Sequence, residues 1–323
     1  MKSLQASPTL VALMTAYLFL ASTVVCRAAL LPPWALNTVV ALGGDQCVPQ
    51  PTGPSQCTWA TEGTAFAYGY LIANDPDPLK RRYRVFLVTA RHVVAEHTGV
   101  FHVRMNPAAG GARGKEFDIP AQATAGPWHF HGDESVDVAV LPVGDLKHLG
   151  VDIQFIPNDI ASEAVGHLKE DGISAGDGAF VLGFPMNLAG AQKNYTIVRN
   201  AIVARIDQLF DGTERTFLLD GFVFPGNSGG PVFSRPDAFS IEGTKAHNKS
   251  VLVGMVISYD PYQDIAISTQ TKRPRVLFEE NSGLTNVVPV DYIDQTIENC
   301  CLLPGERSAK DEMNKAPPQP PKP

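Results

Sequence analysis

The feature that most constrains the fold is a succession of short apolar runs, broken by Gly, Pro, Asn and Asp, between about residues 38 and 290. Most runs are about as long as one strand and are rich in β-branched or aromatic residues, which is typical of sandwich and barrel strands. The clearest runs are residues 84–89, 136–140, 180–182, 216–219 and 251–257. Helical periodicity is scarce, although residues 291–298, entered through Pro289, favour a short C-terminal helix. The pattern therefore predicts an all-β domain.

Composition and charge exclude several classes of protein. Of the 323 residues, 44% are hydrophobic and 18% are charged, so the chain can bury a sizeable core and does not resemble a disordered protein. The formal net charge is −7 and no basic block appears, which argues against nucleic acid or an anionic membrane surface as the main partner. Mean hydropathy is −0.02 with one N-terminal apolar run, which excludes a multi-span membrane protein.

The N-terminal apolar run predicts export. Lys2 precedes an apolar stretch over residues 10–25, and small residues follow at Ala28 and Ala29. This order is that of a secretory signal peptide over residues 1–28, with cleavage after Ala28 or Ala29. An uncleaved membrane anchor is the alternative. A secreted or periplasmic protein is expected, without stable membrane insertion once the signal is removed.

Four cysteines remain after the signal, namely Cys47, Cys57, Cys300 and Cys301. Four cysteines allow three pairings, and the sequence does not choose among them. Cys47 and Cys57 flank a loop rich in Pro, Gly and Ser that would suit one bridge. Adjacent cysteines rarely bridge each other, so Cys300 and Cys301 could instead pin the C-terminus to the N-terminal segment. No Cys-x-x-Cys pair exists, so no metal and no cofactor are expected.

A serine between glycines is the most informative motif. Residues 224–233 read Phe-Pro-Gly-Asn-Ser-Gly-Gly-Pro-Val-Phe, with Ser228 just before an apolar stretch. Acyl transfer needs a nucleophile on a tight turn whose backbone N–H groups converge on one point, and glycines permit such a turn. Taken alone, the motif could equally be a strained connector between strands.

Two further polar residues accompany apolar strands upstream. His92 follows the run at residues 86–89, where packing of the strand would aim its imidazole into a cleft. Asp137 lies within the run at residues 135–141, where burying a carboxylate costs several kcal/mol unless a partner donates a hydrogen bond. A histidine that needs its tautomer fixed would be such a partner. Asp133 is the second candidate for the acid, although it lies outside the apolar run.

His92, Asp137 and Ser228 follow one another at separations of 45 (137 − 92) and 91 (228 − 137) residues. With the motifs Thr-Ala-Arg-His at 89–92, Asp-Val-Ala-Val-Leu at 137–141 and Gly-Asn-Ser-Gly-Gly-Pro at 226–231, the sequence resembles the chymotrypsin/trypsin superfamily of serine peptidases. Val-Leu-Gly-Phe-Pro at 181–185 resembles the bacterial high-temperature-requirement type, here without the PDZ module that normally follows.

The resemblance implies two packed six-stranded antiparallel β-barrels with a short C-terminal helix. It covers residues 60–298, with the first barrel over about 60–145 and the second over about 146–298. Residues 29–59 would form an N-terminal segment, and residues 302–323 a disordered Pro-rich tail.

The resemblance also implies roles for individual residues. His92 would act as the base, Asp137 would orient it, and the N–H groups of Gly226 and Ser228 would form the oxyanion hole. Asn227 stands where zymogen-activated relatives carry an Asp, so activation by an ion pair to a new N-terminus is not expected.

Four residues would form the substrate pocket by the same resemblance. Phe222, six before the serine, would lie at the base of the pocket, and Ile257, Ser258 and Tyr259 would form one wall. These residues predict cleavage after small or medium apolar side chains.

The expected function is therefore that of an exported serine endopeptidase acting on proteins or peptides. An inactive, trypsin-like binding module is the alternative, and a non-peptidase acyl hydrolase is a third possibility. The sequence itself favours catalysis because all three polar positions are filled.

Overall fold

The computed structural model describes residues 29–95, 99–108, 114–121, 126–144, 150–237 and 247–307. The chain divides into two compact units, Met1–Leu30 and Leu31–Pro323, and all the helices and strands named below belong to the second. The expected signal peptide and residues 308–323 of the expected tail lie outside the described residues.

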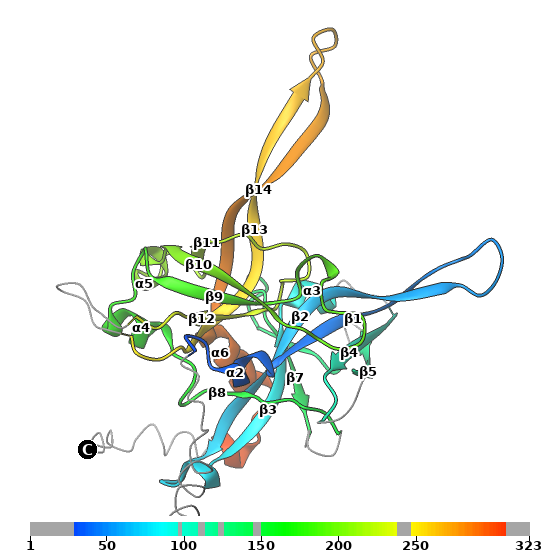
Figure 1. The fold of residues 1–323 in the computed structure, drawn as a ribbon. Coiled ribbons are helices and arrows are strands. Elements are labelled where there is room, and N and C mark those ends of the chain that lie inside the picture. Colours follow the sequence, from blue (N-terminus) through cyan, green and yellow to red (C-terminus); the bar gives the residue numbers. More distant parts are fainter. Residues whose placement is uncertain are drawn as a thin grey trace, which may run out of the picture. The chain divides into compact units, whose positions relative to one another are not determined.

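The N-terminal half of the second unit is a curled sheet in the order β5-β4-β1-β2-β3-β7-β6, and all pairs along this path are antiparallel (Figure 1). Its strands are β1 (Val39–Val48), β2 (Gln56–Ala73), β3 (Arg82–Thr89), β4 (Gly99–Met105), β5 (Lys115–Ala121), β6 (His129–Phe130) and β7 (Ala139–Val143). β8 (Ile156–Pro157) pairs in parallel with β2. The sheet thus begins at Val39, inside the segment predicted to precede the domain.

The C-terminal half is a closed six-stranded antiparallel barrel in the order β10-β11-β14-β13-β12-β9. Its strands are β9 (Gly178–Gly183), β10 (Ile197–Arg205), β11 (Phe217–Asp220), β12 (Pro231–Ser234), β13 (Leu252–Ile267) and β14 (Pro274–Pro289). A closed barrel and a curled sheet with few helices confirm the all-β class and are consistent with a trypsin-like double-barrel fold.

The helices are short, and most connect strands. They include α2 (Pro33–Leu36), α3 (Arg91–Ala95), α4 (Val165–Asp171), α5 (Asp207–Phe210), α6 (Val290–Cys300) and the 3₁₀ turns η1 (Pro78–Lys80) and η3 (Pro185–Asn187). Among the described residues, no helix is long and apolar enough to cross a membrane.

Helix α6 is the predicted C-terminal helix, and it packs across the N-terminal sheet. The Tyr68 hydroxyl donates to Asp294 at 2.8 Å, and the Tyr70 hydroxyl donates to Glu298 at 2.7 Å. Tyr68 and Tyr70 lie two residues apart on one face of β2, and Asp294 and Glu298 lie about one turn apart on one face of α6. The two hydrogen bonds therefore fasten this face of the helix along the strand. Burial raises the pKa of both phenols, which therefore stay protonated and keep donating.

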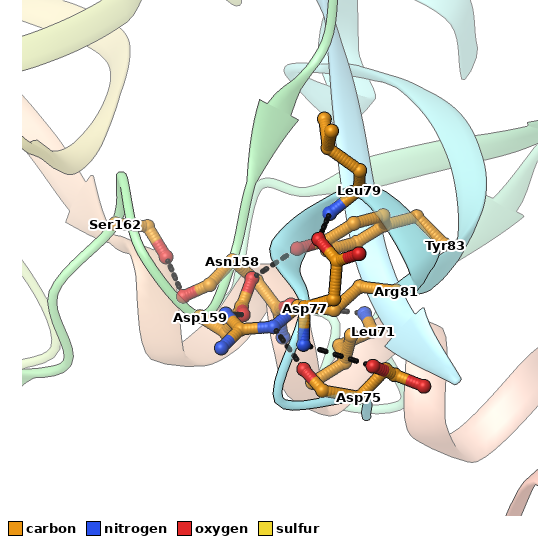
Figure 2. Close-up of polar contacts among 9 residues, drawn as sticks. All are labelled: Leu71, Asp75, Asp77, Leu79, Arg81, Tyr83, Asn158, Asp159 and Ser162. Carbon is orange, nitrogen blue, oxygen red and sulfur yellow. Dashed lines mark hydrogen bonds and ion pairs between the residues drawn. The ribbon is translucent and has the colours of Figure 1, made fainter. Parts of the chain in front are cut away.

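The segment between the two halves is fastened to the β2–β3 end of the sheet (Figure 2). Asp159 accepts hydrogen bonds from Arg81 and from the Tyr83 hydroxyl, the latter at 2.9 Å, and Asn158 accepts from the Leu71 N–H at 2.9 Å. Burial, together with the Asp159 carboxylate, raises the pKa of Tyr83 to about 12. These contacts hold the connection at the point where the chain leaves the sheet for the barrel.

Cys47, Cys57, Cys300 and Cys301 form two disulfides. Cys47 bonds to Cys57 across the end of the β1–β2 hairpin, as its loop suggested. Cys300 bonds to Cys301 at the end of α6. The expectation that this pair would reach back to the N-terminal segment is therefore wrong.

Candidate active site

The Ser228 motif forms a sharp turn between β11 and β12. The Asn227 N–H donates to the Phe224 carbonyl at 2.9 Å, and the Gly230 N–H donates to the Asn227 carbonyl at 2.8 Å. Gly226 and Gly229 adopt φ angles of 97° and 84°, in the left-handed region that disfavours side chains. The motif is thus a tight turn that requires glycine at two of its positions.

The turn is also packed too closely for side chains. A Cβ on Gly229 would collide with the Thr64 carbonyl oxygen and the Thr89 hydroxyl, both of the N-terminal sheet. A Cβ on Gly226 would collide with the Phe184 carbonyl oxygen. Gly229 therefore allows the serine turn to touch the backbone of the N-terminal half, and Gly226 allows it to touch the chain that follows β9.

Thr64 of β2 makes the contacts that hold this turn. Its N–H donates to the Ser228 carbonyl at 2.9 Å, and its hydroxyl donates to the Gly226 carbonyl at 2.6 Å. The same hydroxyl accepts from the Phe184 N–H at 3.2 Å, and the Thr89 hydroxyl donates to the Thr64 carbonyl at 2.7 Å. Thr64 is fully buried, so these bonds are shielded from water. No sequence pattern indicates this role, because threonine is an ordinary residue in a strand.

His92 and Asp137 lie together, as the sequence predicts. Nδ1 of His92 is 2.6 Å from Oδ2 of Asp137, and the backbone N–H of His92 donates to Oδ1 of the same carboxylate at 2.9 Å. His92 follows β3 on the short helix α3, which turns its ring out of the strand. Asp137 lies two residues before β7, so the strand expected at residues 136–140 begins later than predicted. One carboxylate thus holds both the backbone and the ring of the histidine.

Asp133, the second candidate for the acid, has other partners. It accepts hydrogen bonds from the N–H and hydroxyl of Ser135 and forms an ion pair with Arg215. The bonds from Ser135 lower the pKa of Asp133, with a smaller contribution from Arg215. Asp133 is not among the residues that line the pocket shared by His92 and Ser228.

That pocket has a volume of about 300 Å³. It is lined by Glu62, His92, Val223, Phe224, Pro225, Gly226, Asn227, Ser228, Val256, Ile257, Ser258 and Tyr259. The predicted wall of Ile257, Ser258 and Tyr259 is therefore part of it. Glu62, from β2, was not expected there, since nothing in its local sequence separates it from a solvated surface residue.

Phe222 does not line the pocket, contrary to the position expected for it. Its side chain is half exposed, and its ring stacks on Phe224 with centroids 6.5 Å apart. The pocket wall is formed instead by the next two residues, Val223 and Phe224. The turn that carries Ser228 starts at these residues, so the residue six positions before the serine does not lie at the base of the pocket.

Two backbone N–H groups of the turn remain available. Within the described part of the chain, the N–H groups of Gly226 and Ser228 donate to no protein acceptor, whereas that of Gly229 donates to the Val256 carbonyl at 2.8 Å. Both Gly226 and Ser228 line the pocket. An oxyanion that forms at Ser228 could accept hydrogen bonds of this kind.

Outside the pocket, one group of potential metal ligands lies together among the described residues. Ligand atoms of His129, Cys300 and Cys301 lie within 4.8 Å of one another. The two sulfurs are bonded to each other, so neither is available as a thiolate while the disulfide is intact.

Residues 67–238 match the family profile of the trypsin-like peptidase domain. The match covers more than half of the chain and includes His92, Asp137 and Ser228, so the chain belongs to the trypsin-like peptidase family. It is therefore a serine-type peptidase by family, and proteins or peptides are its class of substrate. A search of curated proteins found no match.

The close approach at Gly229 generates a stability prediction. Gly229→Ala should lower the free energy of unfolding by at least about 3 kcal/mol. The new Cβ would collide with Thr64 and Thr89, and the alanine would also have to adopt the positive φ of this position. Gly132→Ala is the matched control, since no atom lies within 4 Å of its Cβ position, and it should stay within about 0.5 kcal/mol of wild type. Urea unfolding measures both. Equal stability of the two variants would contradict the packing described for the turn.

Proposed function

We propose that this protein is an exported serine endopeptidase that cleaves peptide bonds through an acyl-enzyme, with Ser228, His92 and Asp137 as its catalytic triad. The observation that carries the proposal is the double contact of Asp137 with His92, at the pocket that Ser228 also lines. A merely structural histidine would not need its ring and its backbone fixed at the mouth of a pocket.

In the proposed mechanism, the Ser228 oxygen attacks the carbonyl carbon of the scissile bond while His92 accepts the hydroxyl proton at Nε2. Asp137, bonded to Nδ1, holds the ring in the required tautomer and stabilises its cationic form. His92 then gives the proton to the leaving amine, and water hydrolyses the ester in a second round of the same steps. The N–H groups of Gly226 and Ser228 stabilise the oxyanion by about 3 kcal/mol per donor.

The turn needs no ion pair to a new N-terminus in this proposal. The Asn227 side chain is buried, and its Oδ1 accepts a hydrogen bond from the Phe224 N–H at 3.1 Å. Thr64 holds the turn as well, because its hydroxyl and N–H donate to the carbonyl groups of Gly226 and Ser228. An uncharged amide at residue 227 is compatible with this arrangement, whereas a buried carboxylate would require a cation.

An active-site phosphonate probe separates an active peptidase from the alternative, an inactive binding module. The probe should label the wild type at Ser228, as read by peptide mass spectrometry. Ser228→Ala should abolish labelling, and His92→Ala and Asp137→Asn should each slow it by about a thousandfold or more. Ser174→Ala, a change at an exposed serine outside the pocket, is the matched control and should label normally. Absence of labelling in the wild type would refute the catalytic proposal. Turnover of small esters without cleavage of any protein would instead identify an acyl hydrolase.

The proposed specificity is for small or medium apolar residues before the cleaved bond. Val223, Phe224, Val256 and Ile257 give the pocket an apolar lining. Tyr259 also lines the pocket, and we expect its ring to narrow it. In such a pocket one methylene changes the barrier by about 1–3 kcal/mol, so a preference is expected and not strict selection.

A peptide library tests this specificity. The wild type should cleave mainly after Ala, Val or Leu, and Tyr259→Ala should shift the preference toward Phe and Met because it removes the narrowing ring. Ser258→Ala, which removes only a hydroxyl from the same wall, serves as the control and should keep the wild-type preference. Dominant cleavage after Arg or Lys would show that the pocket has been assigned wrongly.

Export and the domain limits complete the proposal. The apolar stretch at residues 10–25 and two disulfides are both compatible with an oxidising compartment, secreted or periplasmic. The peptidase domain would extend to about residue 298, with one half up to about residue 145 and the other after it. Its sheet would take β1 as an additional strand from the segment before residue 60.

A further inference from the structure

Strands β13 and β14 extend beyond the barrel as a two-stranded ribbon, drawn in yellow and orange in Figure 1. From Pro261 to Ile267 the strand β13 pairs with β14 alone, and residues 260–280 are exposed, apart from Ser268. An isolated two-stranded ribbon is only marginally stable in water, and an exposed apolar one is a contact surface for another chain. The ribbon therefore lacks a covering partner within the described part of this chain.

Strand alternation and the pairing register give the ribbon two distinct faces. Ile265 pairs with Leu277, and Gln263 pairs with Glu279 on the same face. Ile267 also belongs to this face. It pairs with Pro274, and the neighbouring Arg275 is the unpaired extra residue of a β-bulge on the same face. Ile265, Ile267 and Leu277 are 51%, 60% and 53% exposed. We call this set of six residues the Leu277 face.

The charges of the Leu277 face are self-complementary. Arg275 lies two residues from Leu277 toward the tip of the ribbon, and Glu279 lies two residues from it toward the barrel. Antiparallel stacking about a two-fold axis at Leu277 brings Arg275 of each copy opposite Glu279 of the other. Glu279 accepts only an exposed hydrogen bond from Gln263 at 3.2 Å, and Arg275 has no acidic partner among the described residues. Both charges are therefore available to a second chain.

The opposite face does not have this property. Its central pair is Asp264 and Phe278, flanked by the pairs Tyr262–Glu280 and Ala266–Val276. A two-fold axis at this centre would bring Asp264 against its own copy, and like charges at such a position are destabilising. The charges thus favour the Leu277 face over the other.

We propose that two copies of this chain form a two-fold symmetric dimer by stacking the Leu277 faces of their ribbons antiparallel. Leu277, Ile265 and Ile267 form the apolar centre, and the two reciprocal pairs of Arg275 and Glu279 form its charged rim. The contact is isologous, so it closes at two copies and leaves no open end for further growth. The proposal does not depend on catalysis.

Sedimentation of the full exported protein tests the dimer. The wild type should sediment as a dimer at micromolar concentration, and Leu277→Asp should sediment as a monomer. Val276→Asp, the matched control on the opposite face, should remain a dimer. The ribbon lies outside the barrel core, so far-UV circular dichroism should show the same fold for all three proteins.

Charge reversal gives a second, independent test. Arg275→Glu and Glu279→Arg should each raise the dimer dissociation constant about tenfold or more, and the double variant should return it to within a few-fold of wild type. Rescue cannot arise within one chain, because four residues along a strand place these side chains about 13 Å apart.

Three results would overturn the proposal. The first is that the wild type stays monomeric at about 100 μM, and the second is that it forms an assembly larger than a dimer. The third is that the double variant of Arg275→Glu and Glu279→Arg fails to restore association. Loss of protein cleavage in the ribbon variants of a monomeric wild type would instead assign the ribbon to substrate binding.

Discussion

The hydrogen bonds of Thr64 are the interaction on which the site depends. This one buried residue of β2 binds the carbonyl groups of Gly226 and Ser228 and accepts from the Phe184 N–H. Thr89, three residues before His92, in turn donates to the Thr64 carbonyl. The strand that leads to the histidine and the turn that carries the serine are therefore fastened to the same residue, although they belong to different halves of the fold.

This constraint explains the glycines of the turn and the shape of the pocket. Backbone groups of the two halves approach so closely at Gly229 that no side chain fits, and within the barrel half the Phe184 carbonyl leaves no room for a side chain at Gly226. The N–H groups of Gly226 and Ser228, which no protein acceptor uses in the described part of the chain, are left at the pocket as a result. The same apposition brings Glu62, two residues before Thr64, to the pocket from the sheet, while β13 supplies Val256 to Tyr259.

The sequence predicted the elements that leave a local pattern. Short apolar runs predicted the all-β class, and a carboxylate in apolar surroundings predicted the contact of Asp137 with His92, which the structure contains. It missed Thr64 and Glu62, because tertiary contacts of ordinary strand residues leave no periodic signal. Phe222 was expected too deep in the site, since residue counting ignores how a turn directs its side chains. The β13–β14 ribbon was missed because its apolar residues cover no core and resemble those of any strand.

The most direct test of this account compares two substitutions at Thr64 by the rate at which a phosphonate probe labels Ser228. Thr64→Ser keeps the hydroxyl and should label within a few-fold of wild type. Thr64→Val keeps the shape of the side chain but removes the bond to the Gly226 carbonyl. The folded variant should label about 10- to 100-fold more slowly, because a small displacement of the Ser228 oxygen lowers the rate of attack by about this factor. Labelling of folded Thr64→Val at the wild-type rate would show that the Thr64 hydroxyl does not position the site.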